Sequence, residues 1–179
     1  MLNDAPRTTE EAYVSATQSS NLRCEPARRT DVDMLIAAGC TPGILGAALM
    51  RLHSEYDSAA KPQVMTEAEA RLLMNRLKSL PRVLEALEAW ARLSRMDAPK
   101  QLTVVAAAHW VDSTCRCCHG RGHELIPGTP SLGRKCKACY GTGKRKDPRG
   151  DDGRRALNMM DDSVNVARDV MRKRLRQSR

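Results

Sequence analysis

Two pairs of cysteines are the residues of this chain best suited to bind a metal ion. Cys115 and Cys118 form one Cys-x-x-Cys pair and Cys136 and Cys139 form another, with seventeen residues between the pairs. Each pair can curl so that both sulfurs point at one ion, at about 2.3 Å, while the loop brings the pairs to opposite sides of a tetrahedron. The spacing predicts one structural zinc ion, Zn²⁺, held by these four cysteines.

The same glycine pattern follows both cysteine pairs. An x-Gly-x-Gly sequence comes directly after the second cysteine of each pair and supplies Gly120, Gly122, Gly141 and Gly143. Glycine tolerates positive φ, so the chain can turn sharply there and aim backbone N–H groups at the thiolates. The repeated glycines make the predicted zinc site more specific than the cysteines alone.

Other uses of the cysteines fit the sequence less well. A disulfide framework is disfavoured because nothing indicates secretion and the number of cysteines, seven, is odd. A thioredoxin-like redox pair would lie in a βαβ unit, which the sequence pattern does not indicate. A catalytic zinc would keep an open coordination position, whereas four cysteines close the shell.

Cys117 and His119 lie beside the first pair and could each replace a predicted ligand. Only the pair Cys115 and Cys118, however, repeats the spacing of the second pair together with its glycine suffix. We therefore treat Cys117 and His119 as non-ligands.

The positive charge of the chain is concentrated in its last third. Residues 1–114 carry 13 basic and 14 acidic side chains, whereas residues 115–179 carry 17 basic and 7 acidic ones. Such a density on a metal-held loop is typical of proteins that contact nucleic-acid phosphates, although a surface charged only for solubility is the alternative. The candidate nucleic-acid-binding residues are Arg116, Arg121, Arg134, Lys135, Lys137, Lys144, Arg145 and Lys146.

The aromatic content indicates which nucleic acid these residues would contact. The chain has no Phe, and only Tyr140 lies near the cysteines. Stacking on unpaired bases needs aromatic side chains, so charge contacts to double-stranded DNA fit this composition better.

Helices must position the cysteines, because apolar residues before and after them recur at intervals of three and four. Thr41 is expected to cap a helix that has Pro42 at its first position. Before it, the polar residues 1–40 predict a loosely ordered arm with one short helix. The helices expected from these patterns cover Asp31–Ala38, Thr41–Tyr56, Leu102–Val111 and a basic, amphipathic C-terminal stretch after residue 153.

A seam of leucines forms the longest apolar pattern. Thr66–Glu69 has the spacing of a capping box and opens onto the seam, which runs from Leu73 to Ala91. Pro81 interrupts it, so we expect a kink or two helices that meet near Ser79. The seam is interpreted as the core of a bundle, with a dimerisation or partner-helix surface as the alternative.

Together these patterns predict a mainly α fold: a small helical bundle with an inserted two-knuckle, four-cysteine zinc-binding loop and a basic C-terminal helix. The expected parts are a polar N-terminal arm (1–40), a helical body (41–114), the four-cysteine segment (115–143) and a basic linker with the C-terminal helix (144–179). No apolar run reaches the roughly 18 residues of a spanning helix, and the N-terminus lacks a signal pattern, so we expect a soluble, cytoplasmic protein.

The order of a helical part, Cys-x-x-Cys-His-Gly-x-Gly, a loop, Cys-x-x-Cys-x-Gly-x-Gly and a basic tail resembles the Q antitermination proteins of lambdoid phages. The resemblance covers about thirty of the 179 residues and rests on Cys115, Cys118, His119, Gly120, Gly122, Cys136, Cys139, Gly141 and Gly143. It implies a non-enzymatic regulator without a small-molecule substrate or a membrane. Such a protein binds DNA near a phage late promoter and makes paused bacterial RNA polymerase holoenzyme read through pauses and terminators.

The same knuckle also resembles the zinc domain of DnaJ chaperones. Those chaperones carry four such motifs and usually a J domain with a His-Pro-Asp sequence, whereas this chain has two motifs and no His-Pro-Asp. The alternative function is therefore a zinc-dependent protein-binding module, a chaperone-like adaptor without specific DNA binding.

Overall fold

The computed structural model describes residues 7–21, 23, 30–62, 65–126, 128–129 and 131–177. This part of the chain forms seven helices and one two-stranded sheet, which confirms the prediction of a mainly α fold with an inserted cysteine-rich loop. The elements are α1 (Thr9–Gln18), α2 (Asp31–Gly39), α3 (Leu45–Ser58), α4 (Glu67–Arg76), α5 (Leu80–Leu93), α6 (Pro99–Val111), β1 (His123–Leu125), β2 (Leu132–Lys135) and α7 (Gly150–Gln177).

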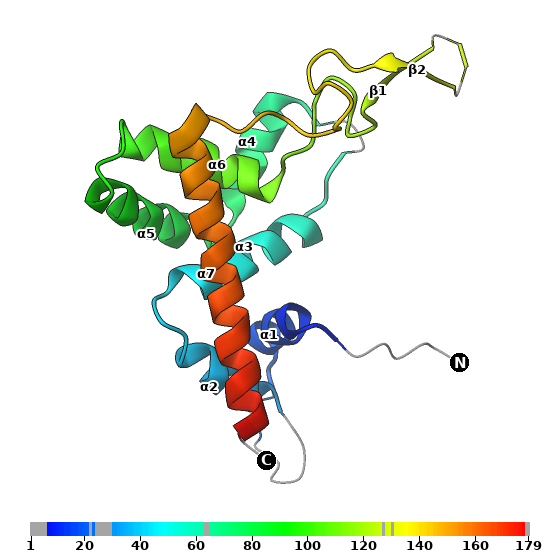
Figure 1. Cartoon of the computed structure of the whole chain (residues 1–179). Helices are drawn as coiled ribbons and strands as arrows, with labels where there is room; N and C mark the ends of the chain where they lie inside the picture. Colours follow the sequence, from blue (N-terminus) through cyan, green and yellow to red (C-terminus); the bar gives the residue numbers. More distant parts are fainter. Residues whose placement is uncertain are drawn as a thin grey trace, which may run out of the picture.

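The C-terminal helix α7 is the longest element and organises the helical body. Its 28 residues span about 42 Å at 1.5 Å per residue. It packs against α1, α2, α3 and α6 (Figure 1). One stripe of the helix supplies the buried side chains Ala156, Met160, Val164, Ala167, Met171 and Leu175. No helix in the described ranges combines the length and the apolar character needed to cross a membrane.

The main core takes buried side chains from all seven helices of the described residues, and α3, α5 and α7 supply the largest of them. Its largest fully buried side chains are aliphatic, as the lack of Phe requires, and include Leu49, Leu52, Leu87 and Met160. Helices α3 and α7 approach each other at Gly46, where a Cβ would lie 2.2 Å from the carbonyl oxygen of Ser163. Glycine is therefore needed at this crossing.

The residues predicted to begin the helices on either side of Ser79 do so in the structure. The Thr66 hydroxyl accepts a hydrogen bond from the Glu69 N–H, and the Glu69 carboxylate accepts one from the Thr66 N–H at 2.8 Å. Two helices, α4 and α5, meet at Ser79, with Pro81 in the first turn of α5 where its missing N–H costs nothing. The predicted break in the leucine seam is confirmed.

The predicted start of a helix at Thr41 is wrong. Helix α3 begins at Leu45, and residues 41–44 form bends. The Thr41 hydroxyl instead donates to the carbonyl of Ala38 at 2.8 Å, and Gly43 has a φ of +72°, which cannot continue a helix. Thr41 therefore closes the end of α2.

The prediction of a loosely ordered arm is wrong for Thr9–Gln18, which form α1. Tyr13 is 3% exposed and Ala16 is 1% exposed, and both belong to the main core. A capping box between Thr8 and Glu11 starts this helix. Part of the supposed arm is thus a packed element of the bundle.

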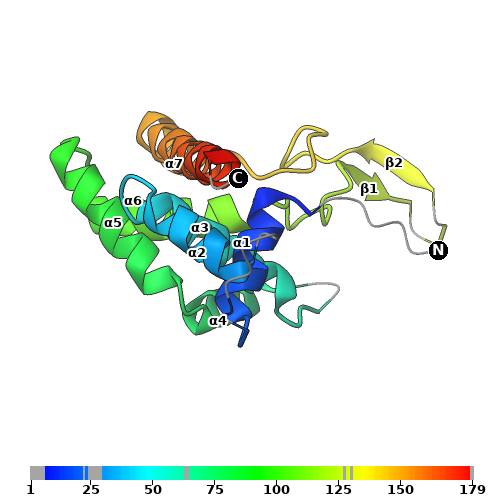
Figure 2. The same cartoon turned by 90° about the horizontal axis from the view of Figure 1, so that it is seen from below.

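The two short strands form an antiparallel hairpin that projects from the helical body (Figures 1 and 2). His123 pairs with Lys135 and Leu125 pairs with Leu132, with an irregularity between these two pairs. The cysteine pairs lie at the base of the hairpin, between it and the helices.

Candidate metal centre

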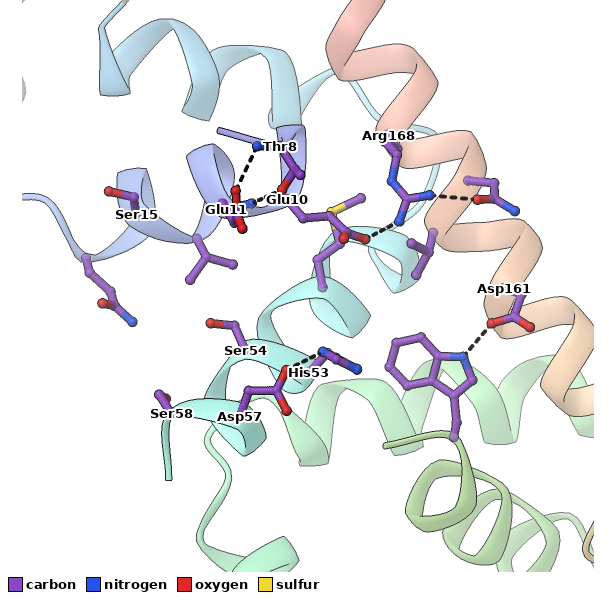
Figure 3. A pocket seen from close by; sticks show the side chains of 16 residues that line it. Thr8, Glu10, Glu11, Ser15, His53, Ser54, Asp57, Ser58, Asp161 and Arg168 are labelled. Atoms are coloured by element: carbon purple, nitrogen blue, oxygen red, sulfur yellow. Dashed lines mark hydrogen bonds and ion pairs between the residues drawn. The ribbon is translucent and has the colours of Figure 1, made fainter. Parts of the chain in front are cut away.

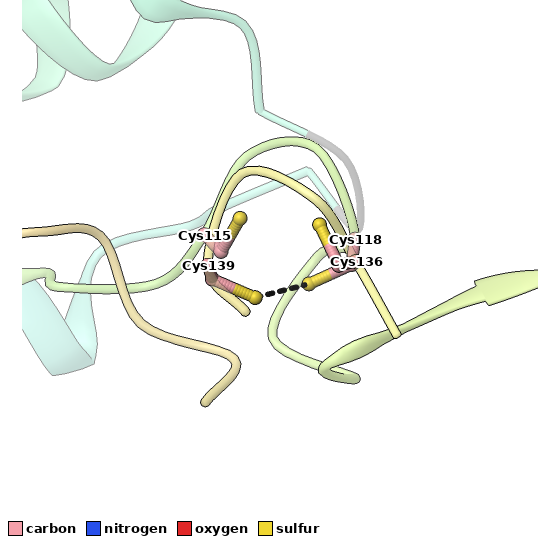
Figure 4. Close-up of side chains that lie close together, drawn as sticks. All are labelled: Cys115, Cys118, Cys136 and Cys139. Carbon is pink, nitrogen blue, oxygen red and sulfur yellow. Dashed lines mark hydrogen bonds between the residues drawn. The ribbon is translucent and has the colours of Figure 1, made fainter. Parts of the chain in front are cut away.

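The four cysteines predicted as ligands lie together at the base of the hairpin (Figure 4). Their sulfur atoms all lie within 4.8 Å of one another, and the Sγ atoms of Cys118 and Cys139 are 3.7 Å apart. A tetrahedral ion with metal–sulfur bonds of about 2.3 Å would place its sulfurs about 3.8 Å apart. A disulfide would need about 2.05 Å. The arrangement therefore suits one metal ion.

These cysteines form a small core of their own. Cys115, Cys118, Cys136 and Cys139 are each at most 3% exposed, and they share no member with the main helical core. The described residues of this segment form no apolar cluster of comparable burial that could hold its loops in place. The buried centre of this segment therefore consists of the four cysteines.

Each second cysteine accepts a backbone hydrogen bond from the last glycine of its suffix. The N–H of Gly122 donates to the Cys118 sulfur at 3.2 Å, and the N–H of Gly143 donates to the Cys139 sulfur at 3.3 Å. Such donors stabilise thiolate charge. The two knuckles thus have the same internal geometry.

The first cysteine of each pair links one knuckle to the other. The N–H of Cys115 donates to the carbonyl of Gly143, and the N–H of Cys136 donates to the carbonyl of Gly122, both at 2.8 Å. This exchange relates the two knuckles as a reciprocal pair and fixes the separation of their sulfurs.

The glycines are required by both backbone conformation and space. Gly120, Gly122, Gly141 and Gly143 all have a positive φ, between +72° and +92°. A Cβ on Gly122 would lie 2.5 Å from the carbonyl oxygen of Gly141, and one on Gly143 would lie 2.3 Å from that of Gly120. The glycine suffixes let the knuckles pack against each other.

The surroundings shift the cysteine pKa values in opposite directions. Burial raises the pKa of Cys118 to about 11, whereas the backbone N–H of Cys139 is the main cause that lowers the pKa of Cys136 to about 6. Burial disfavours ionisation of Cys139, but the N–H groups of Gly143 and Gly141 outweigh it and lower the pKa of that thiol. Four adjacent thiolates would repel one another, so a bound cation is what allows all four to ionise.

Cys117 and His119 do not belong to this group of sulfurs. Both side chains are exposed, and among the described residues the group that could hold a metal ion consists of the four predicted cysteines. The group that the structure brings together is the one predicted from the repeat of the second pair, and the Cys117 thiol contacts Cys136 at its edge.

Six of the eight predicted DNA contacts have exposed side chains around the cysteine cluster. These are Arg121, Arg134, Lys135, Lys137, Lys144 and Lys146. The Lys146 ammonium lies 4.9 Å from the centre of the Tyr140 ring. The structure thus gathers most of the predicted basic residues on the surface of one small unit.

The other two predicted DNA contacts, Arg116 and Arg145, are partly buried and point at Asp112. The Arg116 guanidinium pairs with the Asp112 carboxylate at 2.7 Å, and the Arg145 guanidinium donates to the Asp112 carbonyl. The Tyr56 hydroxyl, on α3, donates to the same carboxylate at 2.9 Å. We therefore assign Arg116 and Arg145 to the joint between the four-cysteine segment and the helices.

A groove of about 960 Å³ between α1, α3, α6 and α7 was not expected from the sequence (Figure 3). In it, the His53 Nδ1 atom lies 2.9 Å from an Asp57 oxygen, and the Trp110 indole N–H donates to Asp161 at 2.7 Å. The His53 and Trp110 rings meet edge to face. His53 and Asp57 are four residues apart on one helix, which a search for helical i,i+4 pairs could have found.

Comparison of the chain with family models, curated proteins and solved structures finds no match.

Proposed function

We propose that Cys115, Cys118, Cys136 and Cys139 bind one structural zinc ion. The support is the donor set: four buried sulfurs within 4.8 Å of one another, two of which accept hydrogen bonds from backbone N–H groups. Thiolate sets of this geometry select zinc or iron–sulfur centres, and four protein ligands around zinc leave no position for a substrate. A closed shell supports a non-enzymatic role.

We infer that the four-cysteine segment and the residues directly after it bind double-stranded DNA. The observation that carries this proposal is the charge of residues 115–146, which hold eight basic side chains and one acidic one, Glu124. Six of the basic side chains are exposed, two on β2 and four on the loops around the four-cysteine group. Fixed positive charge favours phosphates because little conformational entropy is lost when the contacts form.

We further propose that the protein is a phage-type transcription antitermination factor. The motif resemblance supports this function, because the cysteines and glycines that carry it form one compact unit. In this proposal the four-cysteine segment holds DNA near a late promoter, and the helical body contacts paused bacterial RNA polymerase. The protein acts in the cytoplasm of the host cell.

A salt titration of DNA binding tests the proposed interface. Lys137→Glu with Lys144→Glu reverses two exposed charges whose side chains do not contact Asp112, and Lys78→Glu with Lys100→Glu reverses two exposed charges on the helical body. Fluorescence anisotropy on a duplex of about 30 base pairs should give a steep negative slope of log K against log salt for the wild type. The first variant should make the slope less negative by roughly 1.8, because two phosphate contacts are lost, and the second should leave it unchanged.

Two further measurements complete the test. Zinc content and circular dichroism must match among the three proteins, so that a loss of binding reports charge and not unfolding. A flat salt dependence of the wild type contradicts the DNA interface. If no protein binds DNA and all three suppress aggregation of an unfolded client equally, the function is the protein-binding module. Co-purification with purified RNA polymerase, with and without promoter DNA, tests the polymerase contact.

A further inference from the structure

The far end of the β-hairpin carries exposed apolar side chains. Leu125 is 45% exposed, Ile126 is 44% exposed and Leu132 is 57% exposed. Leu125 and Leu132 are paired across the two strands, so they lie side by side. None of the three belongs to a buried core, and the hairpin projects away from the helices (Figure 2). About half of the surface of each side chain is therefore open to a partner.

The surroundings of this apolar end are basic. Arg134 and Lys135 follow Leu132 on β2, and all three are exposed. Arg121 and Lys137 are exposed at the base of the hairpin, and Glu124 is the one acidic residue of the segment. A partner that suits this surface must offer an apolar gap between rows of negative charge. A base step between two phosphate backbones has that chemistry.

The hairpin is held rigidly at its base. β1 begins directly after Gly122, and β2 ends directly before Cys136. The Cys136 N–H donates to the Gly122 carbonyl at 2.8 Å, so both strands leave the cysteine cluster from one fixed point. Separating stacked bases costs a few kcal/mol. A rigid support lets the energy of the surrounding DNA contacts offset that cost, because the hairpin does not bend away from the bases.

The segment lacks two of the usual side chains for direct base reading. Residues 115–146 contain no Asn and no Gln, the side chains that form paired hydrogen bonds with adenine. Recognition through the shape and deformability of DNA needs no such groups. Apolar wedges beside Arg and Lys are what minor-groove proteins use for that purpose.

We propose that Leu125, Ile126 and Leu132 form a wedge that enters the minor groove and partly unstacks a base step. Arg134 and Lys135 hold the flanking phosphates. The wedge kinks the duplex, by an angle in the range of about 20–90° known for such proteins, and selects flexible pyrimidine–purine steps. This inference rests on the DNA binding proposed above and specifies how the DNA is recognised.

Bending of labelled DNA tests the wedge. The probe is a duplex of about 30 base pairs with a donor and an acceptor dye at its ends and a central TA step, compared with a duplex that has a GC-rich centre. Leu125→Ser with Leu132→Ser removes the wedge. Leu72→Ser with Leu93→Ser is the matched control, because these leucines are 59% and 86% exposed on the helical body.

The wild type and the control should raise energy transfer and prefer the TA duplex by about tenfold. The wedge variant should bind with the same salt slope but lose both the bend and the preference. Salt-dependent binding of the wild type without bending overturns the wedge and leaves the DNA interface standing, whereas absence of DNA binding overturns both. A wedge variant that bends DNA normally but no longer binds purified RNA polymerase shows that the hairpin end is a protein surface, and also overturns the wedge.

Discussion

The tightest requirement at the scale of single residues is for glycine where the two knuckles touch. Gly143 and Gly128 both have positive φ, at +72° and +78°. A Cβ on Gly143 would lie 2.3 Å from the Gly120 carbonyl oxygen, whereas one on Gly128 would have no neighbour within 4 Å. The two positions therefore separate the cost of backbone conformation from the cost of contact.

We expect Gly143→Ala to weaken metal binding by more than about tenfold and Gly128→Ala to leave it unchanged. An alanine at positive φ costs roughly 1–2 kcal/mol at either site, but only at Gly143 must the knuckles also separate. Competition with a zinc-binding dye, and the sulfur-to-cobalt charge-transfer band of the Co²⁺-loaded protein, measure the effect. Equal affinities for the two variants would contradict the close packing of the knuckles.

The grouping of the four cysteines could be predicted from the sequence, but the contacts of two arginines could not. A Cys-x-x-Cys pair with its glycine turn is a local structure, so spacing alone identified all four sulfurs. Arg145 contacts Asp112 from 33 residues away, a distance over which no local pattern connects two residues. Sequence reasoning placed Arg116 and Arg145 on the DNA surface because it could detect their charge but not their partner.

At the scale of secondary-structure elements, the crossing of α3 and α7 depends on Gly46. We expect Gly46→Ala to destabilise the protein by about 3 kcal/mol, the upper end of the usual overpacking range, because the new Cβ would meet the Ser163 backbone. Gly39→Ala, at the end of α2 with no neighbour within 4 Å, should change stability by less than about 1 kcal/mol.

Urea unfolding followed by circular dichroism measures both glycine variants. If Gly46→Ala costs no more than Gly39→Ala, then α3 and α7 are free to move apart and do not form a fixed crossing.

Elements were predictable where capping and periodicity agreed. Thr66–Glu69 combines a capping box with a long apolar run, and α4 was predicted from it. Thr8 and Glu11 form the same box before α1, but that helix buries only Tyr13 and Ala16. Two buried residues are too few to show the repeat of apolar positions that marks an amphipathic helix. Packing against the rest of the bundle therefore contributes most of the stability of α1.

For the whole molecule, the cysteine core shares no member with the two apolar clusters of the helical body, so removal of a metal bound there should affect one part only. We expect a chelator to unfold the four-cysteine segment, because its described loops have no other buried cluster, while the helical bundle remains folded. Far-UV circular dichroism should retain most of its helical signal, and hydrogen exchange should lose protection over residues 115–144.

Adding zinc back should restore that protection, which separates metal loss from irreversible damage. Collapse of the helical signal together with the four-cysteine segment would mean that the metal centre supports the entire fold.

The general architecture followed from the sequence, but the contacts between helices did not. The excess positive charge and most of the cysteines fall in one stretch of sequence, so the inserted segment was visible without a structure. An amphipathic pattern shows which side of α7 is buried but not which helices cover it. The groove around His53 and Trp110 combines four helices and could not be foreseen for the same reason.

The ends of the four-cysteine segment meet where it joins the helices. Thr114 and Lys144 form an antiparallel bridge, and the backbone N–H of Arg145 donates to the Ser113 carbonyl at 2.7 Å. A host loop would therefore need an opening of only about 5 Å, one strand spacing, to accept the unit. The segment has the geometry of a transplantable cassette: we expect that it can be replaced by a short turn, or grafted with its four cysteines onto another scaffold.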